Sequence, residues 1–169
     1  DGEHFTTMFR DMLYESKSLD EAVDRIKSAK RIKKYHYVVG DGQEKKAVKM
    51  KAHAPNLEIW ADNDPADELK PNTLNDVVYH CEGRDPLGWA HLNKHLGLGG
   101  YSADDMVSLS REVATKGGNL LNVVYDATAL ELWVAYAEKN ENAYLRPYVH
   151  LKLSDYIPYN PKGENVMRV

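Results

Sequence analysis

The stretch Asn119-Leu-Leu-Asn-Val-Val-Tyr-Asp-Ala-Thr-Ala-Leu-Glu-Leu-Trp-Val-Ala-Tyr136 decides the fold, because it reads as two strands joined by a tight turn. β-Branched and aromatic residues dominate both halves, as they do in β-strands. The turn is expected at Asp126-Ala-Thr-Ala129, where the Asp carboxylate can accept hydrogen bonds from nearby backbone N–H groups. The first strand is apolar on both faces, so we expect it to be covered on both sides, and we expect the hairpin near the middle of its sheet.

Composition predicts an ordinary globular domain. A chain of 169 residues, 43% hydrophobic and 28% charged, suits a single domain over residues 1–169. The net charge of −4 gives no general attraction to nucleic acid or to anionic membranes, so neither is expected as a partner. The basic run from Lys27 to Lys34 is interpreted as a helix end, where cations complement the helix dipole. No apolar run approaches the roughly 20 residues of a membrane span.

The single cysteine, Cys81, excludes a disulfide within the chain and a cysteine-based metal cage. It leaves the cellular compartment open, and the oligomeric state is equally open. The sequence begins Asp1-Gly-Glu-His4 without an initiator Met. We therefore expect a processed or partial chain, the C-terminal portion of a larger protein.

Two helices are expected before the first strand. Apolar residues recur at helical spacing over residues 5–16. Ser18-Leu-Asp-Glu21 is a capping-box pattern that opens a second helix, since Ser18 can accept from the Glu21 N–H while Glu21 reaches back. The segments expected next are strands at 35–39, 47–53 and 57–61, a turn at Gly40-Asp-Gly42 and a surface loop at 62–71.

The second half of the chain is expected to alternate short elements. These are a strand at 77–79, a helix at 87–96, a firmer helix after Ser102, the opening hairpin, and a strand at 144–153 that Pro147 places near a sheet edge. Paired helices and hairpin-connected strands favour an α+β fold with largely antiparallel sheets over a doubly wound fold. The sequence contains no GxGxxG, P-loop or HExxH motif, and no cofactor is expected.

Reactive residue types concentrate at His80-Cys81-Glu82. A functional interpretation makes Cys81 a nucleophile with His80 or a distant histidine as its base. Adjacent residues of an extended chain point to opposite faces, however, so His80 is poorly placed to serve its neighbour. A buried, inert cysteine is the alternative interpretation, with Glu82 in a surface charge cluster.

Histidines supply the other candidates. His91 and His95 are four residues apart on an expected helix, a spacing that can place two imidazoles on one metal ion. No third ligand accompanies them, and an exposed polar helix face explains them equally. His36 and His53 lie within expected strands, where either could face a pocket. These residues taken alone indicate an α+β domain without a defined chemistry.

Four stretches together resemble the penicillin acyltransferase-like family of linear amide hydrolases, which are autoproteolytic enzymes with an N-terminal nucleophile. The resemblance runs in the same order from about Phe5 to Pro158. The stretches are Phe5-Thr-Thr-Met-Phe-Arg-Asp-Met-Leu13, Ser18-Leu-Asp-Glu-Ala-Val23, Tyr35-His-Tyr-Val-Val-Gly-Asp-Gly42 followed by Ala47 to Pro55, and Asn119 to Asp126 followed by Leu132-Trp-Val-Ala135.

The resemblance implies a layered αββα sandwich and the cleavage or transfer of an acyl group at a linear amide. It also implies a nucleophilic cysteine made N-terminal by self-cleavage, whose own amine serves as the base. Residue 1 is Asp and Cys81 is internal, so the nucleophile is expected in a segment upstream of this sequence. The partners implied are that N-terminal segment and a small acyl-amide substrate.

The chain departs from the family pattern at one supporting position. The family places an oxyanion-stabilising Asn in a stretch that corresponds here to Tyr79-His-Cys-Glu-Gly83, which contains no Asn. Arg10 and Asp11 match helix residues of the family and are interpreted as structural. Two alternatives to the amide hydrolase stay open: a non-catalytic binding or assembly domain that retains the fold, and a hydrolase dependent on Cys81 with His80 or His36 as base.

Overall fold

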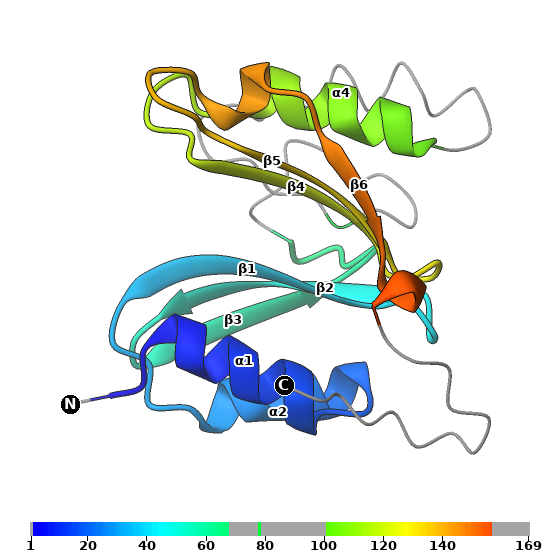
Figure 1. Ribbon diagram of the computed structural model, residues 1–169. Coiled ribbons are helices and arrows are strands. Elements are labelled where there is room, and N and C mark those ends of the chain that lie inside the picture. The colour runs from blue at the N-terminus through cyan, green and yellow to red at the C-terminus, as the bar shows by residue number, and fades with distance from the viewer. Residues whose placement is uncertain (1, 68–77, 79–100, 157–169) are drawn as a thin grey trace. The chain divides into compact units, whose positions relative to one another are not determined.

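The computed structural model describes residues 2–67, 78 and 101–156, which form α-helices and antiparallel β-sheets. The chain divides into two compact units, Asp1–His80 and Cys81–Val169. Each unit contains one three-stranded sheet with helical segments (Figure 1). The predicted α+β class with antiparallel sheets is confirmed.

The first unit opens with helices α1 (Phe5–Glu15) and α2 (Leu19–Ser28), both of which the sequence predicts. The Ser18 side chain accepts a hydrogen bond from the Glu21 N–H, as expected of an N-cap. A capping box would also have the Glu21 carboxylate accept from the Ser18 N–H. Here it accepts instead from the N–H of the preceding residue, Lys17, at 2.7 Å. Arg25 joins the two helices by pairing with Asp11, which agrees with the structural interpretation of that residue.

Three strands follow in the order β1 (Lys34–Asp41), β2 (Lys46–His53) and β3 (Asn56–Ala61), and neighbouring strands are antiparallel. The first turn lies at residues 42–45, later than the predicted Gly40-Asp-Gly42, because Gly40 and Asp41 still pair with β2. The Asp41 carboxylate accepts hydrogen bonds from the Gln43 and Glu44 N–H groups and so holds this turn.

The core of the first unit lies between its helices and one face of its sheet. Its most buried side chains are at most 1% exposed to solvent, and they are Met8 and Ile26 from the helices and Met50 and Ala52 from β2. In the same cluster the Phe9 ring meets Tyr37 of β1 edge to face, and beside it the Phe5 ring packs against Tyr35 at a tilt. Figure 1 shows α1 and α2 together on this side of the sheet. The side chains that alternate with the core positions of β1, β2 and β3 therefore lie on the opposite face.

The segment before α1 lies tightly against the end of α2. The Glu3 N–H donates to the Lys30 carbonyl at 2.8 Å, and Glu3 forms a parallel bridge with Arg31. A Cβ at Gly2 would lie 2.2 Å from Ile32 Cγ2 and 2.4 Å from the Lys30 oxygen. This close approach requires glycine at position 2.

The second unit contains α4 (Ala103–Val113) and the strands β4 (Leu121–Asp126), β5 (Glu131–Tyr136) and β6 (Val149–Lys152). Short 3-10 helices, η1 (Ala143–Leu145) and η2 (Leu153–Asp155), flank β6. The predicted helix after Ser102 is confirmed with a complete capping box between Ser102 and Asp105. The predicted strand at 77–79 and helix at 87–96 fall largely outside the described residues.

The predicted hairpin at Asn119–Tyr136 is confirmed, with the Asp126 carboxylate accepting from the Thr128 and Ala129 N–H groups in the turn. Of its two strands, only the second lies in the middle of the described sheet. The order is β4-β5-β6, so β5 is central and β4 lies at an edge of the described sheet. Leu121 and Tyr125 of β4 are 47% and 71% exposed, because α4 covers only the alternate side chains, such as Val124.

The strand predicted at 144–153 is shorter in the structure. β6 begins at Val149, and η1 occupies the preceding residues, where the Tyr144 N–H donates to the Asn119 side chain. This hydrogen bond and one from the Asn119 N–H to Asn142 hold the segment in a turn. The predicted edge position of the last strand is confirmed by the pairing of β6 with β5 at one side of the described sheet.

Candidate functional site

Two of the histidines singled out in the sequence lie on neighbouring strands. His36 of β1 and His53 of β2 have ring centroids 6.2 Å apart in an edge-to-face arrangement. Their residues share the sheet face that points away from α1 and α2. The candidates His80, Cys81, Glu82, His91 and His95 lie outside the described residues.

This surface, the polar face of the first sheet, arises from strict alternation along β2. Val48, Met50 and Ala52 point into the core, and the residues between them point to the other side. The polar face is defined here by the side chains of His36, Lys49, Lys51, His53, Glu58 and Trp60.

A buried ion pair lies on the polar face. The Lys49 ammonium is 2.6 Å from the Asp67 carboxylate, and the two side chains are 2% and 12% exposed. Trp60, opposite Lys49 in the register, donates from its indole Nε1 to the Ala66 carbonyl at 3.0 Å. These two contacts fold residues 62–67 back onto the sheet, so the predicted surface loop is anchored at its described end.

The two histidines lie beside a second, more exposed ion pair. Lys51 pairs with Glu58 at 3.2 Å, and Lys51 is opposite His36 in the register. Burial, reinforced by the nearby charges of Lys34 and Lys51, lowers the pKa of His53 below its ordinary value of 6.5. The His53 Nε2 atom is buried and has no hydrogen-bond partner. His53 is therefore a neutral imidazole at neutral pH, with one ring nitrogen free of protein partners.

The arrangement suits hydrogen bonding and proton exchange with a bound molecule. A neutral imidazole can accept or donate a proton near pH 7, and an adjacent ammonium can donate a hydrogen bond to a carbonyl oxygen. Within residues 2–67, 78 and 101–156, no group of three His, Cys, Asp or Glu side chains is placed to hold a metal ion. Nor does any cysteine fall in that part of the chain.

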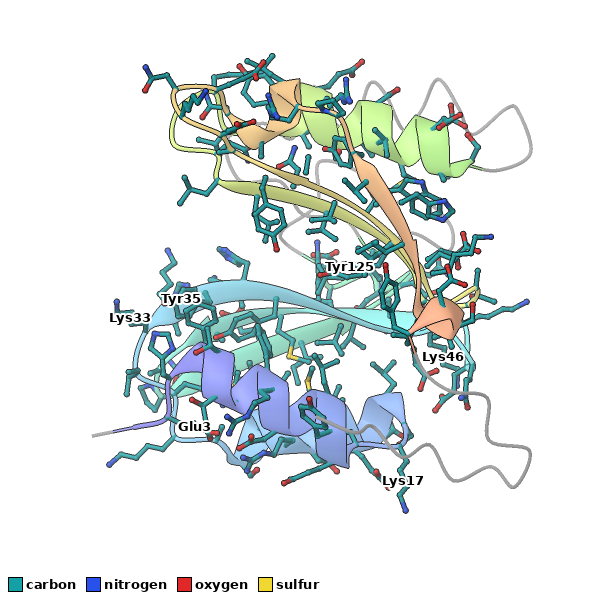
Figure 2. The ribbon with its side chains drawn as sticks, in the orientation of Figure 1. Glu3, Lys17, Lys33, Tyr35, Lys46 and Tyr125 are labelled. Atoms are coloured by element: carbon teal, nitrogen blue, oxygen red, sulfur yellow. The ribbon has the colours of Figure 1, made fainter. Side chains whose placement is uncertain are left out.

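The second sheet carries a contrasting surface on the side away from α4. Register places only apolar side chains there, and this surface is called the apolar face. Tyr125, labelled in Figure 2, is its most exposed member. The apolar face is defined by Leu121, Val123, Tyr125, Leu132, Val134, Tyr136, Val149 and Leu151.

The α4 side of the same sheet holds the charged groups instead. His150 stacks on Trp133 with ring centroids 4.4 Å apart, and its Nε2 is 2.7 Å from Glu131. Hydrogen bonds from Lys152 and then His150 lower the pKa of Glu131. Charge on this sheet is therefore segregated to one face.

The sequence did not predict the buried ion pair between Lys49 and Asp67. Lys49 lies between Val48 and Met50, and an alternating strand pattern usually indicates that such a lysine faces solvent. Its burial depends on Asp67, a residue 18 positions later whose pairing no local pattern predicts.

Comparisons with protein-family models, with curated proteins and with solved structures find no match for this chain. Among the described residues, none of the helices has the length and apolar character needed to cross a bilayer.

Proposed function

We propose that this chain forms the scaffold and acyl-pocket wall of a linear amide hydrolase or acyltransferase that acts on C–N bonds. The observation that carries the proposal is the polar face, where neutral His53 and cationic Lys51 lie on a sheet backed by a helix pair. The ordered sequence stretches that resemble the penicillin acyltransferase-like family support it.

The proposed architecture is the αββα sandwich of that family. Each unit supports this architecture separately. The described helices pack against one face of each sheet, and no described helix packs against the other face. A sheet whose second face is as apolar as that of β4, β5 and β6 is typical of a layered protein. Cysteine labelling at Val149→Cys in a Cys81→Ala background tests the layering: slow labelling supports it, and labelling as fast as at an exposed loop contradicts it.

In the proposed reaction the nucleophile is a cysteine from the N-terminal segment of the same protein, outside these residues. Its sulfur adds to the amide carbon, the amine departs with a proton, and water or a second amine then takes the acyl group from sulfur. Lys51 would donate a hydrogen bond to the acyl oxygen, and the imidazole of His53 beside it would exchange the proton.

An assay of the 169-residue chain and of the complete protein tests the proposal. We expect the complete protein to hydrolyse N-acyl amides and the 169-residue chain to be inactive. A His53→Gln change in the complete protein should lower kcat by about 10²-fold and alter its pH profile. Amide cleavage by the 169-residue chain that survives Cys81→Ala would refute the requirement for an outside nucleophile.

A non-catalytic binding or assembly domain is the second candidate, and the exposed apolar face favours it. The sequence encoded upstream of Asp1 separates the candidates. A cysteine at a self-cleavage site supports the hydrolase, and a protein without one supports the binding domain. Alkylation of the folded chain tests the Cys81-dependent hydrolase, because an unreactive thiol contradicts it.

A further inference from the structure

The side chain of Arg31 joins the end of α2 to the turn between β2 and β3. Its Nη1 atom donates hydrogen bonds to the carbonyls of Ile26 and Ala29 at the C-terminal end of the helix. Its Nη2 atom donates to the carbonyl of Pro55 at 3.1 Å. A cation that complements the helix dipole accounts for the first two bonds but not for the third.

The turn that Arg31 holds is short and begins directly after His53. Only Ala54 and Pro55 separate His53 from Asn56, its partner in the β2–β3 register. In so tight a hairpin, the position of the turn constrains the backbone of the residues on either side of it. The ends of hairpins are where strands open most readily, so a side chain that grips the Pro55 carbonyl opposes opening at His53.

We infer that Arg31 is a positioning residue for His53, an inference that rests on the proposed role of His53 in amide cleavage. Arg31 bonds to a backbone carbonyl two residues beyond His53, so it acts through the backbone of the turn. The guanidinium is suited to this task because its separate nitrogens can hold the helix end and the turn at the same time.

The imidazole of His53 is sensitive to the closure of this end of the sheet. Burial is the main cause that lowers its pKa, and its Nε2 atom is buried without a hydrogen-bond partner. The charges of Lys34 and His36 on β1 and Lys51 on β2 lower the pKa further, and Glu58 on β3 raises it. Release of the turn would admit water to the ring, and water favours the protonated form. The pKa of His53 therefore reports whether the turn is held.

NMR titration of the histidine ring protons in the 169-residue chain tests the inference. Arg31→Lys keeps the positive charge at the helix end, but one ammonium group cannot hold the α2 carbonyls and the Pro55 carbonyl together. We expect the pKa of His53 in this variant to rise toward its ordinary value of 6.5. Circular dichroism melts establish that the variant folds.

Arg25→Lys is the matched control. The guanidinium of Arg25 also joins separate segments, since it pairs with Glu3 before α1 and with Asp11 within α1, but these partners belong to the helical side of the unit. We expect Arg25→Lys to leave the pKa of His53 unchanged.

A second variant serves if Arg31→Lys does not fold. In Arg31→Gln, one amide nitrogen likewise cannot reach both elements, so the pKa of His53 should rise. Lys33→Gln removes a charge at a neighbouring exposed position and is its control for the loss of charge alone. The rise should be larger in Arg31→Gln than in Lys33→Gln.

An unchanged pKa of His53 in folded Arg31→Lys, or an equal rise in Arg25→Lys, would overturn the inference. Failure of the proposed function gives a different result. A pKa that rises only in Arg31→Lys, in a complete protein that cleaves no amide, keeps the positioning of His53 and rejects the hydrolase. In an active complete protein, Arg31→Lys should move the acid limb of the kcat/KM profile to higher pH. Amide cleavage with an unmoved acid limb and an unmoved pKa keeps the hydrolase and rejects the role of Arg31.

Discussion

The ammonium of Lys49 lies 2.6 Å from the carboxylate of Asp67, and both side chains are largely removed from solvent. Removing one partner of a buried pair leaves the other charge uncompensated. We expect Lys49→Met and Asp67→Asn each to lower the free energy of unfolding by about 3 kcal/mol in urea titrations. The double variant should lose much less than the sum of the single losses, and additive losses would contradict the coupling.

The depressed pKa of His53 predicts a loss of stability in mild acid. The unfolded chain binds the proton near the ordinary pKa of 6.5, and the folded chain binds it only at lower pH. The stability due to this group is therefore complete above about pH 6.5 and is lost as the pH falls through the folded pKa. Thermal melts from pH 8 to pH 5 should show this decline, and His53→Gln should flatten it. An unchanged profile in the variant would show that His53 does not titrate in this way.

The N-cap of α4 predicts a local effect. The Ser102 hydroxyl accepts from the Asp105 N–H at 3.2 Å, and the Asp105 carboxylate accepts from the Ser102 N–H at 2.9 Å. Ser102→Ala should cost about 1 kcal/mol in chemical denaturation. Ser108→Ala is the matched control, since Ser108 is exposed within the same helix and alanine is the better helix former there. Equal effects of the two changes would show that the cap is not the cause.

The contact at Gly2 predicts that even the smallest side chain is harmful there. An added methyl group would meet the Lys30 carbonyl and Ile32, and the segment must move away, losing the Glu3 N–H to Lys30 hydrogen bond. We expect Gly2→Ala to lower the free energy of unfolding by about 1 kcal/mol. Gly117→Ala, where a Cβ meets nothing within 4 Å, should change it by less than about 0.5 kcal/mol. A neutral Gly2→Ala would show that this segment adds nothing to stability.

The features that sequence predicted well are those set by neighbouring residues. Helical spacing gave α1, the Ser18 and Ser102 caps gave the starts of α2 and α4, and alternation gave the hairpins. Helix starts, helical spacing and strand alternation depend on backbone and side-chain preferences that act within a few residues. Within the described sheet, β5 is central because it also pairs with β6, and β4 is left at an edge. No local pattern encodes that tertiary pairing, so the sequence did not predict it.

The candidate site was predicted only in part, for the same reason. His36 and His53 were named from the sequence, but their proximity depends on the β1–β2 register. The burial that depresses the pKa of His53 likewise requires the folded sheet. The assignment of function to this surface stays a prediction, because the reaction depends on groups beyond the polar face.

Because β2 supplies Met50 and Ala52 to the core and Lys49 and Lys51 to the polar face, its register governs both surfaces at once. A one-residue insertion inside β2 would rotate every later side chain to the other face, placing cations among the methionines. The same insertion in the exposed turn at residues 42–45 could be absorbed without that exchange. Laboratory diversification of this protein can therefore change loop length freely at 42–45, whereas β2 admits substitutions only.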